Sequence, residues 1–267
     1  LPDLDWLFCK ERLRVASHLP APTSLVSDVS MLIDKLGRTI SNLRISVTDR
    51  CNFRCLYCMP EEGMEWLPKE GILSFEELER IVRVLAPMGI RKLRLTGGEP
   101  LLRRDLPRLI SLLRTIEGID DIALTTNALL LAEQAEALQE SGLDRVNVSL
   151  DSLLRERFKQ ITRRDALDRV LRGIEQAAKT FQGPLKINAV LIRGLNDAET
   201  PAFAELARKH GHTIRFIEYM PLDADESWSR SSLVTGAEIR KRIDRHLDNG
   251  ARLIEDPARD QRAPAAD

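Results

Sequence analysis

Residues 43–58 read LRISVTDRCNFRCLYC, and this stretch decides the fold prediction because a strand pattern runs directly into a cysteine motif. Apolar residues at 43, 45 and 47 alternate with polar ones at 44, 46 and 48, which indicates a β-strand with one apolar and one polar face. Cys51, Cys55 and Cys58 follow in the order C-x3-C-x2-C. Because cysteine thiolates hold iron-sulfur clusters, we predict a cluster site just beyond the end of this strand.

The three thiolates are one fewer than a [4Fe-4S] cluster needs for full ligation. The fourth cysteine, Cys9, lies 42 residues upstream of Cys51 without ligand spacing, and we assign it no role. One iron would therefore keep an open position, where a small molecule could bind and react. Zinc binding and thiol redox chemistry are the alternatives. Zinc fits poorly because it prefers four ligands and the nearest histidines, His18 and His210, are remote.

The rest of the chain continues the strand pattern and separates the strands by helical patterns. Further β-branched runs lie near 91–96, 121–126, 145–150, 186–191 and 213–219. Six strand-helix units predict an α/β fold with a parallel sheet, since parallel strands need crossover connections. A capping-box pattern at Ser74 and Glu77 predicts a helix start there. We expect residues 37–222 to form this core, with a weakly patterned extension over 1–36 and the start of a C-terminal extension over 223–267.

The predicted strands alternate apolar and polar residues, whereas parallel strands with helices on both faces are usually apolar throughout. In the second strand, for example, Leu93 and Leu95 alternate with Lys92, Arg94 and Thr96. If the apolar faces meet the helices, the polar faces line the lumen of a barrel. An antiparallel sheet with one solvated face is the alternative, but helical patterns between nearly all the strands disfavour it.

Cations gather on the polar faces of these strands. They are Arg44, Lys92, Arg94, Lys186 and Arg215. Inside a barrel such charges would be costly unless an anion met them. Arginine pairs with phosphate oxygens in a bidentate manner and lysine offers a compact charge, so a triphosphate would suit this set. Ordinary surface ion pairs are the alternative for any one of these residues, but their placement together on several strands favours the anion site.

Composition indicates an ordinary globular enzyme. The 267 residues are 43% hydrophobic, enough for a sizeable core. Forty basic residues nearly balance 41 acidic ones, which favours neither nucleic acid nor an anionic membrane as a partner. The sequence has no uninterrupted apolar stretch of membrane-spanning length and no signal-peptide pattern. Free cysteines in a cluster motif predict a reducing compartment, the cytoplasm.

The motif RISVTDRCNFRCLYCMP resembles the radical S-adenosylmethionine (SAM) superfamily, and most closely its molybdenum-cofactor branch, the GTP 3′,8-cyclases. Further segments resemble that branch in the same order: KLRLTGGEPLLRRDL, LTTNALLL, VNVSLDSL, KINAV and RFIEYMPL. The match runs from about residue 37 to residue 220. It implies a partial (βα)6 TIM-like barrel, and radical SAM enzymes that modify peptides or act in haem synthesis are the alternative within the superfamily. A non-catalytic zinc-binding scaffold is the alternative from another class.

The resemblance also implies a chemistry and a set of binding residues. In the superfamily, SAM binds the open iron of the [4Fe-4S] cluster and is cleaved to a 5′-deoxyadenosyl radical that abstracts a substrate hydrogen. Besides the three cluster ligands, the matched SAM positions are Tyr57, Gly98, Ser149 and Met220. The matched GTP positions are Arg44, Arg94, Thr125 and Lys186, with Lys92 and Arg215 at substrate-side basic positions.

The sequence departs from the cyclase pattern after the matched core. Cyclases of this kind carry a second cluster motif and a basic RxR element in a C-terminal extension, whereas no cysteine follows Cys58 here. Either the chain is the N-terminal portion of a longer cyclase, which we favour, or it is a variant without the second cluster. A second [4Fe-4S] cluster is expected only if that region exists elsewhere. The implied partners are GTP, an electron donor and a downstream molybdopterin-precursor enzyme, and residues 1–36 could form a homodimer contact.

Overall fold

A computed structural model of the chain describes residues 30–181, 183–221 and 228–246. Its six strands form one sheet in the order β1-β2-β3-β4-β5-β6, and every neighbouring pair is parallel. The strands are β1 (Asn42–Ser46), β2 (Lys92–Thr96), β3 (Asp121–Thr126), β4 (Arg145–Ser149), β5 (Lys186–Leu191) and β6 (Thr213–Glu218). The predicted parallel sheet is therefore confirmed, and the antiparallel alternative is wrong.

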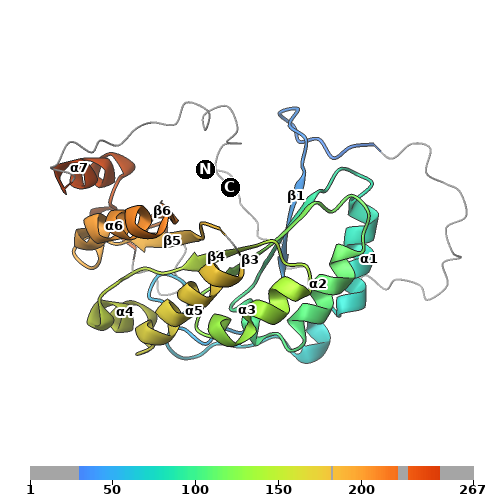
Figure 1. The fold of residues 1–267 in the computed structure, drawn as a ribbon, viewed down its shortest axis with the longest axis horizontal. Helices are drawn as coiled ribbons and strands as arrows, with labels where there is room; N and C mark the ends of the chain where they lie inside the picture. The colour runs from blue at the N-terminus through green and yellow to red at the C-terminus, as the bar shows by residue number, and fades with distance from the viewer. Residues whose placement is uncertain (1–29, 182, 222–227, 247–267) are drawn as a thin grey trace, which may run out of the picture. The chain divides into compact units, whose positions relative to one another are not determined.

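Helices follow the strands along the chain, and those between β1 and β6 connect consecutive strands and lie along one face of the sheet (Figure 1). They are α1 (Phe75–Leu85), α2 (Leu106–Arg114), α3 (Leu131–Glu140), α4 (Arg155–Thr162), α5 (Leu167–Thr180), α6 (Thr200–His210) and α7 (Gly236–His246). Four 3₁₀ turns accompany them: η1 (Lys69–Gly71), η2 (Pro100–Leu102), η3 (Asp197–Glu199) and η4 (Arg230–Ser232). The arrangement is the partial, TIM-like α/β fold that the alternation of strands and helices predicts.

The hydrophobic core lies between the helices and the apolar face of the sheet. Leu93 and Leu95 of β2 are fully buried there, as are Leu109 and Leu113 of α2. Burial of such side chains contributes about 25 cal/mol per Å² of apolar surface removed from water. On the other face of β2, Lys92 is exposed, and Arg94 and Thr96 are half-buried. The strands therefore turn their polar face away from the helices, as the sequence pattern predicts.

Local signals in the sequence mark helix boundaries correctly. Ser74 caps α1, accepting a hydrogen bond from the backbone N–H of Glu77 (3.2 Å), while the Glu77 carboxylate accepts one from the Ser74 N–H (2.7 Å). Helix α6 ends at Gly211, which adopts a left-handed conformation (φ 69°) that glycine tolerates well. These interactions satisfy backbone groups that the helix itself leaves without partners.

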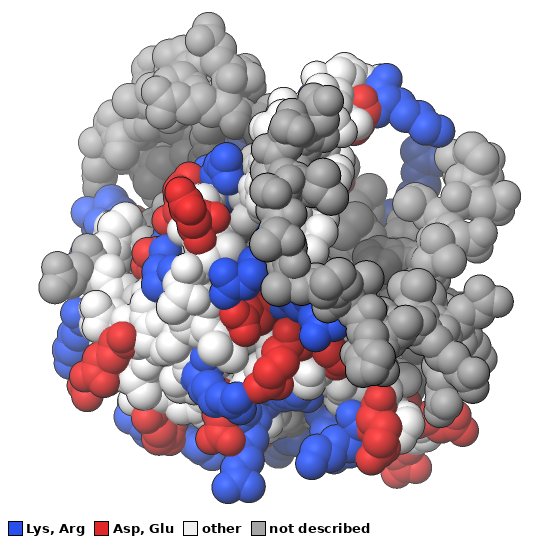
Figure 2. Space-filling view, turned by 90° about the vertical axis from the view of Figure 1, so that its right-hand side faces the viewer, with Lys and Arg blue, Asp and Glu red and all other residues white. Residues whose placement is uncertain are grey.

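The predicted segments beyond the barrel are described only in part. Cys9 and His18, with residues 1–29 of the expected N-terminal extension, lie outside the described residues. Within residues 223–267, helix α7 packs through Ile239 and Ile243 against a small cluster that includes Leu191 of β5. None of the helices described is long and apolar enough to cross a bilayer. The outer surface beside α1 mixes cations and carboxylates (Figure 2), with pairs such as Arg108–Glu76 at 2.5 Å.

Candidate active site

The cysteine loop begins beyond the carboxyl end of β1 and is fixed to the end of helix α4. The backbone N–H of Arg54 donates to the carbonyl of Thr162, and that of Leu56 donates to Ile161, both at 3.0 Å. The Phe53 ring packs edge-on against the Phe158 ring at 5.7 Å between centroids. The loop is therefore held by backbone and aromatic contacts on both sides of Cys55.

Two arginines after α4 bind the carbonyl groups of the same loop. The Arg163 guanidinium donates to the carbonyls of Arg54 (3.5 Å) and Met59 (3.4 Å), and Arg164 donates to that of Asn52 (3.2 Å). Arg163 adopts a left-handed conformation (φ 56°), which is uncommon for a residue with a side chain. Backbone strain of this kind persists where surrounding contacts require it, here the contacts with the cysteine loop.

The three thiols of the cysteine loop form one set of potential metal ligands. All three are free, and the charges of Cys51 and Cys58 raise the pKa of Cys55, so the three thiols lie near one another. Cysteine thiolates are the ligands that hold iron-sulfur clusters, so this donor set fits the predicted cluster.

Burial sets the protonation state of these thiols. It raises the pKa of Cys51 and raises that of Cys55 well above the usual value, and the nearby Asp151 carboxylate raises the Cys55 pKa further. Metal-free thiols therefore stay protonated at neutral pH, and cluster ligation would release protons. The backbone N–H of Phe53 points at the Cys51 sulfur (3.4 Å), the kind of hydrogen bond that tunes a bound cluster.

Tyr57, between two of the cysteines, is tied to the end of strand β4. Its hydroxyl donates to Oδ2 of Asp151 (2.6 Å), and Oδ1 of Asp151 accepts from the backbone N–H of Val190 (2.8 Å). Asn196 donates to the Asp151 carbonyl (2.7 Å). Burial raises the pKa of Asp151 to about 6, against the hydrogen bonds from Tyr57 and Val190, which lower it. The Asp151 carboxyl thus links the cysteine loop to β4 and β5.

The Gly97-Gly98-Glu99 run lies against the backbone that leads into the cysteines. Gly98 donates its N–H to the Thr48 carbonyl and Glu99 donates to the Arg50 carbonyl, both at 2.8 Å. A Cβ atom on Gly98 would lie 2.4 Å from the Arg50 oxygen, so no side chain fits there. The buried Glu99 carboxylate accepts from Thr126 Oγ1 (2.6 Å) and the Asn127 N–H (2.7 Å). The glycine run therefore fixes the start of the cysteine loop, and Glu99 joins it to β3.

The predicted SAM positions gather at the carboxyl ends of the strands. Ser149 is the last residue of β4, and Gly98 lies two residues after the end of β2, beside the cysteine loop. Met220 follows β6 and is half exposed. Since carboxyl ends of parallel strands meet at one edge, the structure brings these positions to the same edge as Tyr57. Their contacts with SAM stay predictions.

The predicted GTP positions occupy the polar face of the sheet. Arg44 of β1 is the register partner of Arg94 of β2. Thr125 of β3 and Lys186 of β5 both lie in register with Asn147, on the strand between them. Two further predicted cations share this face: Lys92 begins β2, and Arg215 of β6 pairs in register with Asn188 of β5. The strands thus carry the predicted cations on one face, below the cysteine loop.

The sequence analysis missed several polar residues of the site. One is Asn188, which lies two residues after Lys186 and so on the same face of the strand. Another is Arg145, which lies two residues before Asn147. The period-two pattern alone could have found both. Asp121 opens β3 on the same face, as its register with Lys92 shows. The roles of Asp151 and Arg163 depend on contacts with residues about a hundred positions away, for which the sequence holds no local signal.

Comparisons with known proteins give the class to which this fold and loop belong. The family model of the radical SAM superfamily matches residues 45–207. The chain therefore belongs to the radical SAM superfamily. Solved structures with the same fold include methylornithine synthase (TM-score 0.59, 13% identity, 78% of this chain and 64% of that one) and the [FeFe]-hydrogenase maturase HydG (TM-score 0.59, 19% identity, 76% and 47%).

Curated relatives are more similar in sequence. A GTP 3′,8-cyclase of Paenarthrobacter nicotinovorans is 50% identical over 210 residues, covering 78% of this chain and 59% of the relative. A GTP 3′,8-cyclase of Syntrophomonas wolfei subsp. wolfei is 50% identical over 213 residues, covering 80% and 65%. The chain thus spans about three fifths of the length of these curated relatives.

Replacement of Gly98 tests the glycine contact. Gly98→Ala places a methyl group against backbone carbonyls that cannot move aside, so we expect the free energy of unfolding to fall by about 3 kcal/mol. The cysteine loop should shift, and iron retained per chain after anaerobic reconstitution should fall. Gly71→Ala is the matched control, because its Cβ meets only ordinary contacts of 3.6 Å or more. Iron retention by Gly98→Ala equal to that of the wild type would contradict this account.

The pKa of Asp151 predicts a pH-dependent stability. Between pH about 4 and 6 the folded protein keeps Asp151 protonated while the unfolded chain has lost the proton, so rising pH destabilises the fold. Relative to Asp151→Asn, the wild type should lose about 3 kcal/mol of unfolding free energy across this window and change little above it. Urea unfolding at several pH values measures the difference. Asp244→Asn, on the exposed side of α7, is the control, and a pH-independent difference for Asp151→Asn would refute the assignment.

Proposed function

We propose that this chain is the radical SAM portion of a GTP 3′,8-cyclase. The proposed reaction converts GTP to (8S)-3′,8-cyclo-7,8-dihydroguanosine 5′-triphosphate, an early step toward molybdopterin. The observation that carries the proposal is the juxtaposition of three free thiols, at the carboxyl edge of the sheet, with a row of cations on the polar face beneath them. Radical generation and a polyanionic substrate would thus share one lumen.

The upper part of the proposed site would hold the cluster and SAM. Cys51, Cys55 and Cys58 are the proposed ligands of three irons of a [4Fe-4S] cluster. When bound, this cluster would supply one electron that cleaves SAM to 5′-deoxyadenosyl radical and methionine. Gly98 and Ser149 lie at the same edge of the sheet, where backbone carbonyls and a hydroxyl could bind the amino-acid and ribose parts of SAM. The hydrogen bonds of Tyr57 and Asp151 would keep the loop in position.

The lower part of the proposed site would hold GTP. Arg44 and Arg94, adjacent in register, present guanidinium groups that suit the bidentate geometry of phosphate oxygens. Lys186 and Thr125 would add a charge and a hydroxyl from β5 and β3, and Lys92 and Arg215 would raise the positive potential. Placed between the phosphate-binding residues and the cysteine loop, the ribose would face the radical, which would abstract the 3′ hydrogen. The C3′ radical would then add to C8 of guanine, and the electron donor would supply the one electron that, with a proton, completes the dihydro product.

The names of the curated relatives support GTP as the substrate. We propose further that a reducing cytoplasm supplies the electron donor, because a cluster held by exposed and half-buried thiols requires reducing conditions. A downstream enzyme of molybdopterin-precursor synthesis would take the product. The upstream segment, residues 1–36, is proposed as a homodimer contact.

Thermal protection by GTP tests substrate binding separately from catalysis. A ligand at 100 times its Kd that binds only the folded state stabilises it by about 2.7 kcal/mol, which corresponds to roughly 5–10 °C in Tm. We expect such a shift for the wild-type chain and a much smaller one for Arg94→Gln and Lys186→Gln. Arg208→Gln is the control, because Arg208 is exposed on α6 and pairs with Glu205. Equal protection of all variants, or none of the wild type, would refute the proposed site.

A further inference from the structure

Arg145 lies in the same row of the sheet as two of the proposed phosphate-binding arginines. Register pairs Arg44 with Arg94, Arg94 with Ala123, and Ala123 with Arg145. Neighbouring strands lie about 4.8 Å apart, so Arg94 and Arg145 start about 10 Å apart with only the Ala123 methyl group between them. The row therefore places an arginine on each side of Ala123, which is itself buried.

Arg145 is paired with a carboxylate on the same face of the sheet. Its Nε donates to Oδ1 of Asp121 (2.7 Å), and its Nη2 donates to Oδ2, so the pair is bidentate. The register partner of Asp121 on the other side is Lys92. Among the residues of the six strands, all within the described chain, Asp121 is the one carboxylate on the polar face, which carries six cations. They are Arg44, Lys92, Arg94, Arg145, Lys186 and Arg215.

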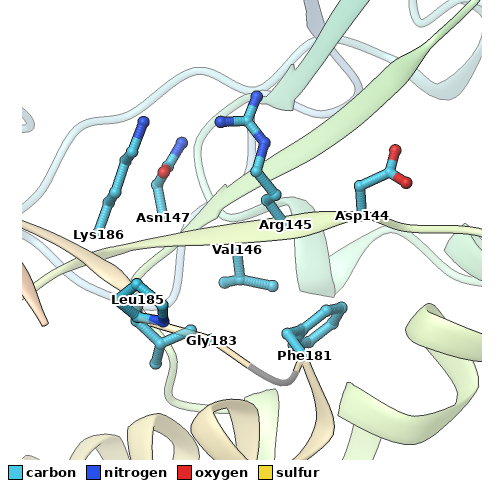
Figure 3. Close-up of a pocket in the computed structure, with 9 residues that line it drawn as sticks. Asp144, Arg145, Val146, Asn147, Phe181, Gly183, Leu185 and Lys186 are labelled. Carbon is cyan, nitrogen blue, oxygen red and sulfur yellow. The ribbon is translucent and has the colours of Figure 1, made fainter. Parts of the chain in front are cut away.

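A cavity of about 280 Å³ at the amino-terminal ends of β4 and β5 is lined by Arg145, Asn147 and Lys186, among others. Strands β4 and β5 pair only from Asn147 and Lys186 onward, so the two backbones are not paired before these residues. Figure 3 shows Arg145, Asn147 and Lys186 projecting to the same side, while Val146 and Phe181 lie on the other. An anion that reaches Lys186 from the lumen would therefore also come within reach of Asn147 and Arg145.

We propose that Arg145 is a further phosphate-binding residue of the nucleoside triphosphate site, and that Asp121 is its internal counter-ion, which the triphosphate displaces. This inference rests on the proposed function. The guanidinium fork of Arg145 fits a carboxylate and a phosphate in the same bidentate manner. Because a triphosphate carries more charge than one carboxylate, the exchange favours the nucleotide, and the Asp121 carboxylate stays beside Lys92. No covalent bond changes in this exchange.

A purely structural ion pair is the competing interpretation of the same contact. Such a pair would hold β3 to β4, and its loss would weaken binding of any ligand by disturbing the sheet. The counter-ion role predicts opposite effects for the two partners: loss of Arg145 removes a phosphate contact, whereas loss of Asp121 removes a competitor for Arg145. Only the counter-ion role predicts an effect that depends on the phosphates of the ligand.

Titration calorimetry of the reconstituted chain with GTP and with guanosine, at fixed ionic strength, separates the two interpretations. We expect Arg145→Gln to weaken GTP roughly tenfold, the effect of one lost charge-assisted contact, and Arg145→Lys to weaken it about threefold. Guanosine affinity should stay unchanged in both. Asp121→Asn should tighten GTP about threefold, a gain that a misfolded variant cannot produce. The control is Arg83→Gln on α1, which breaks the ion pair with Glu79 and should leave both affinities unchanged.

Three other results would contradict the role of Arg145, the counter-ion role of Asp121 or the proposed function. Equal GTP affinity of Arg145→Gln and the wild type would overturn the role of Arg145. Parallel losses of GTP and guanosine affinity in both the Arg145 and Asp121 variants would assign the pair a structural role instead. A wild-type chain that binds no GTP would overturn the proposed function itself, and this inference with it.

Discussion

The close approach of the Gly97-Gly98 backbone to the segment Thr48–Arg50 is the constraint on which the site depends. Two backbone hydrogen bonds of 2.8 Å join these segments, and a Cβ on either glycine would lie within 2.5 Å of a backbone oxygen. The contact extends the pairing of β1 with β2 beyond the last strand residues, so the cysteine loop starts from a fixed position. Cys51 follows immediately after this contact, and its place relative to the sheet is thereby set.

The rest of the loop is fixed by contacts from the opposite direction. The end of α4, with Thr162 and Arg163, holds its backbone, and Tyr57 reaches Asp151 at the end of β4. The loop is therefore preorganised by hydrogen bonds that do not involve the thiols. Such an arrangement lowers the entropic cost of binding a cluster, because the three thiolates need not be gathered by the metal itself.

Charge is distributed unevenly between the helices and the polar face of the sheet. The net formal charge is only −1, and outer cations such as Arg83 pair with carboxylates on the helices. The polar face of the sheet instead carries a strong excess of cations over the single carboxylate of Asp121. Arg44, Lys92 and Arg215 on this face are exposed, and an excess of positive charge on one face attracts a polyanionic ligand.

Much of this organisation could be predicted from the sequence because it depends on periodic or local signals. Alternating residues at 43–48 and 92–96 placed the strands and their polar face, and Ser74 with Glu77 marked a helix start. The alternation also indicated a lumen. What could not be predicted are contacts between distant residues: Tyr57 and Asp151 are 94 positions apart, and no local pattern pairs them. The same holds for the arginines after α4, which in the sequence are two among many charged residues.

The most direct measurement of the central claim uses GTP deuterated at the ribose 3′ carbon with the anaerobically reconstituted chain, SAM and a reductant. The 5′-deoxyadenosine formed is then analysed by mass spectrometry. If the cysteine loop and the cationic lumen form one site, the deuterium appears in 5′-deoxyadenosine, because the ribose of a nucleotide bound by the cations faces the radical. Formation of 5′-deoxyadenosine without deuterium, at a rate that GTP does not change, would contradict the account.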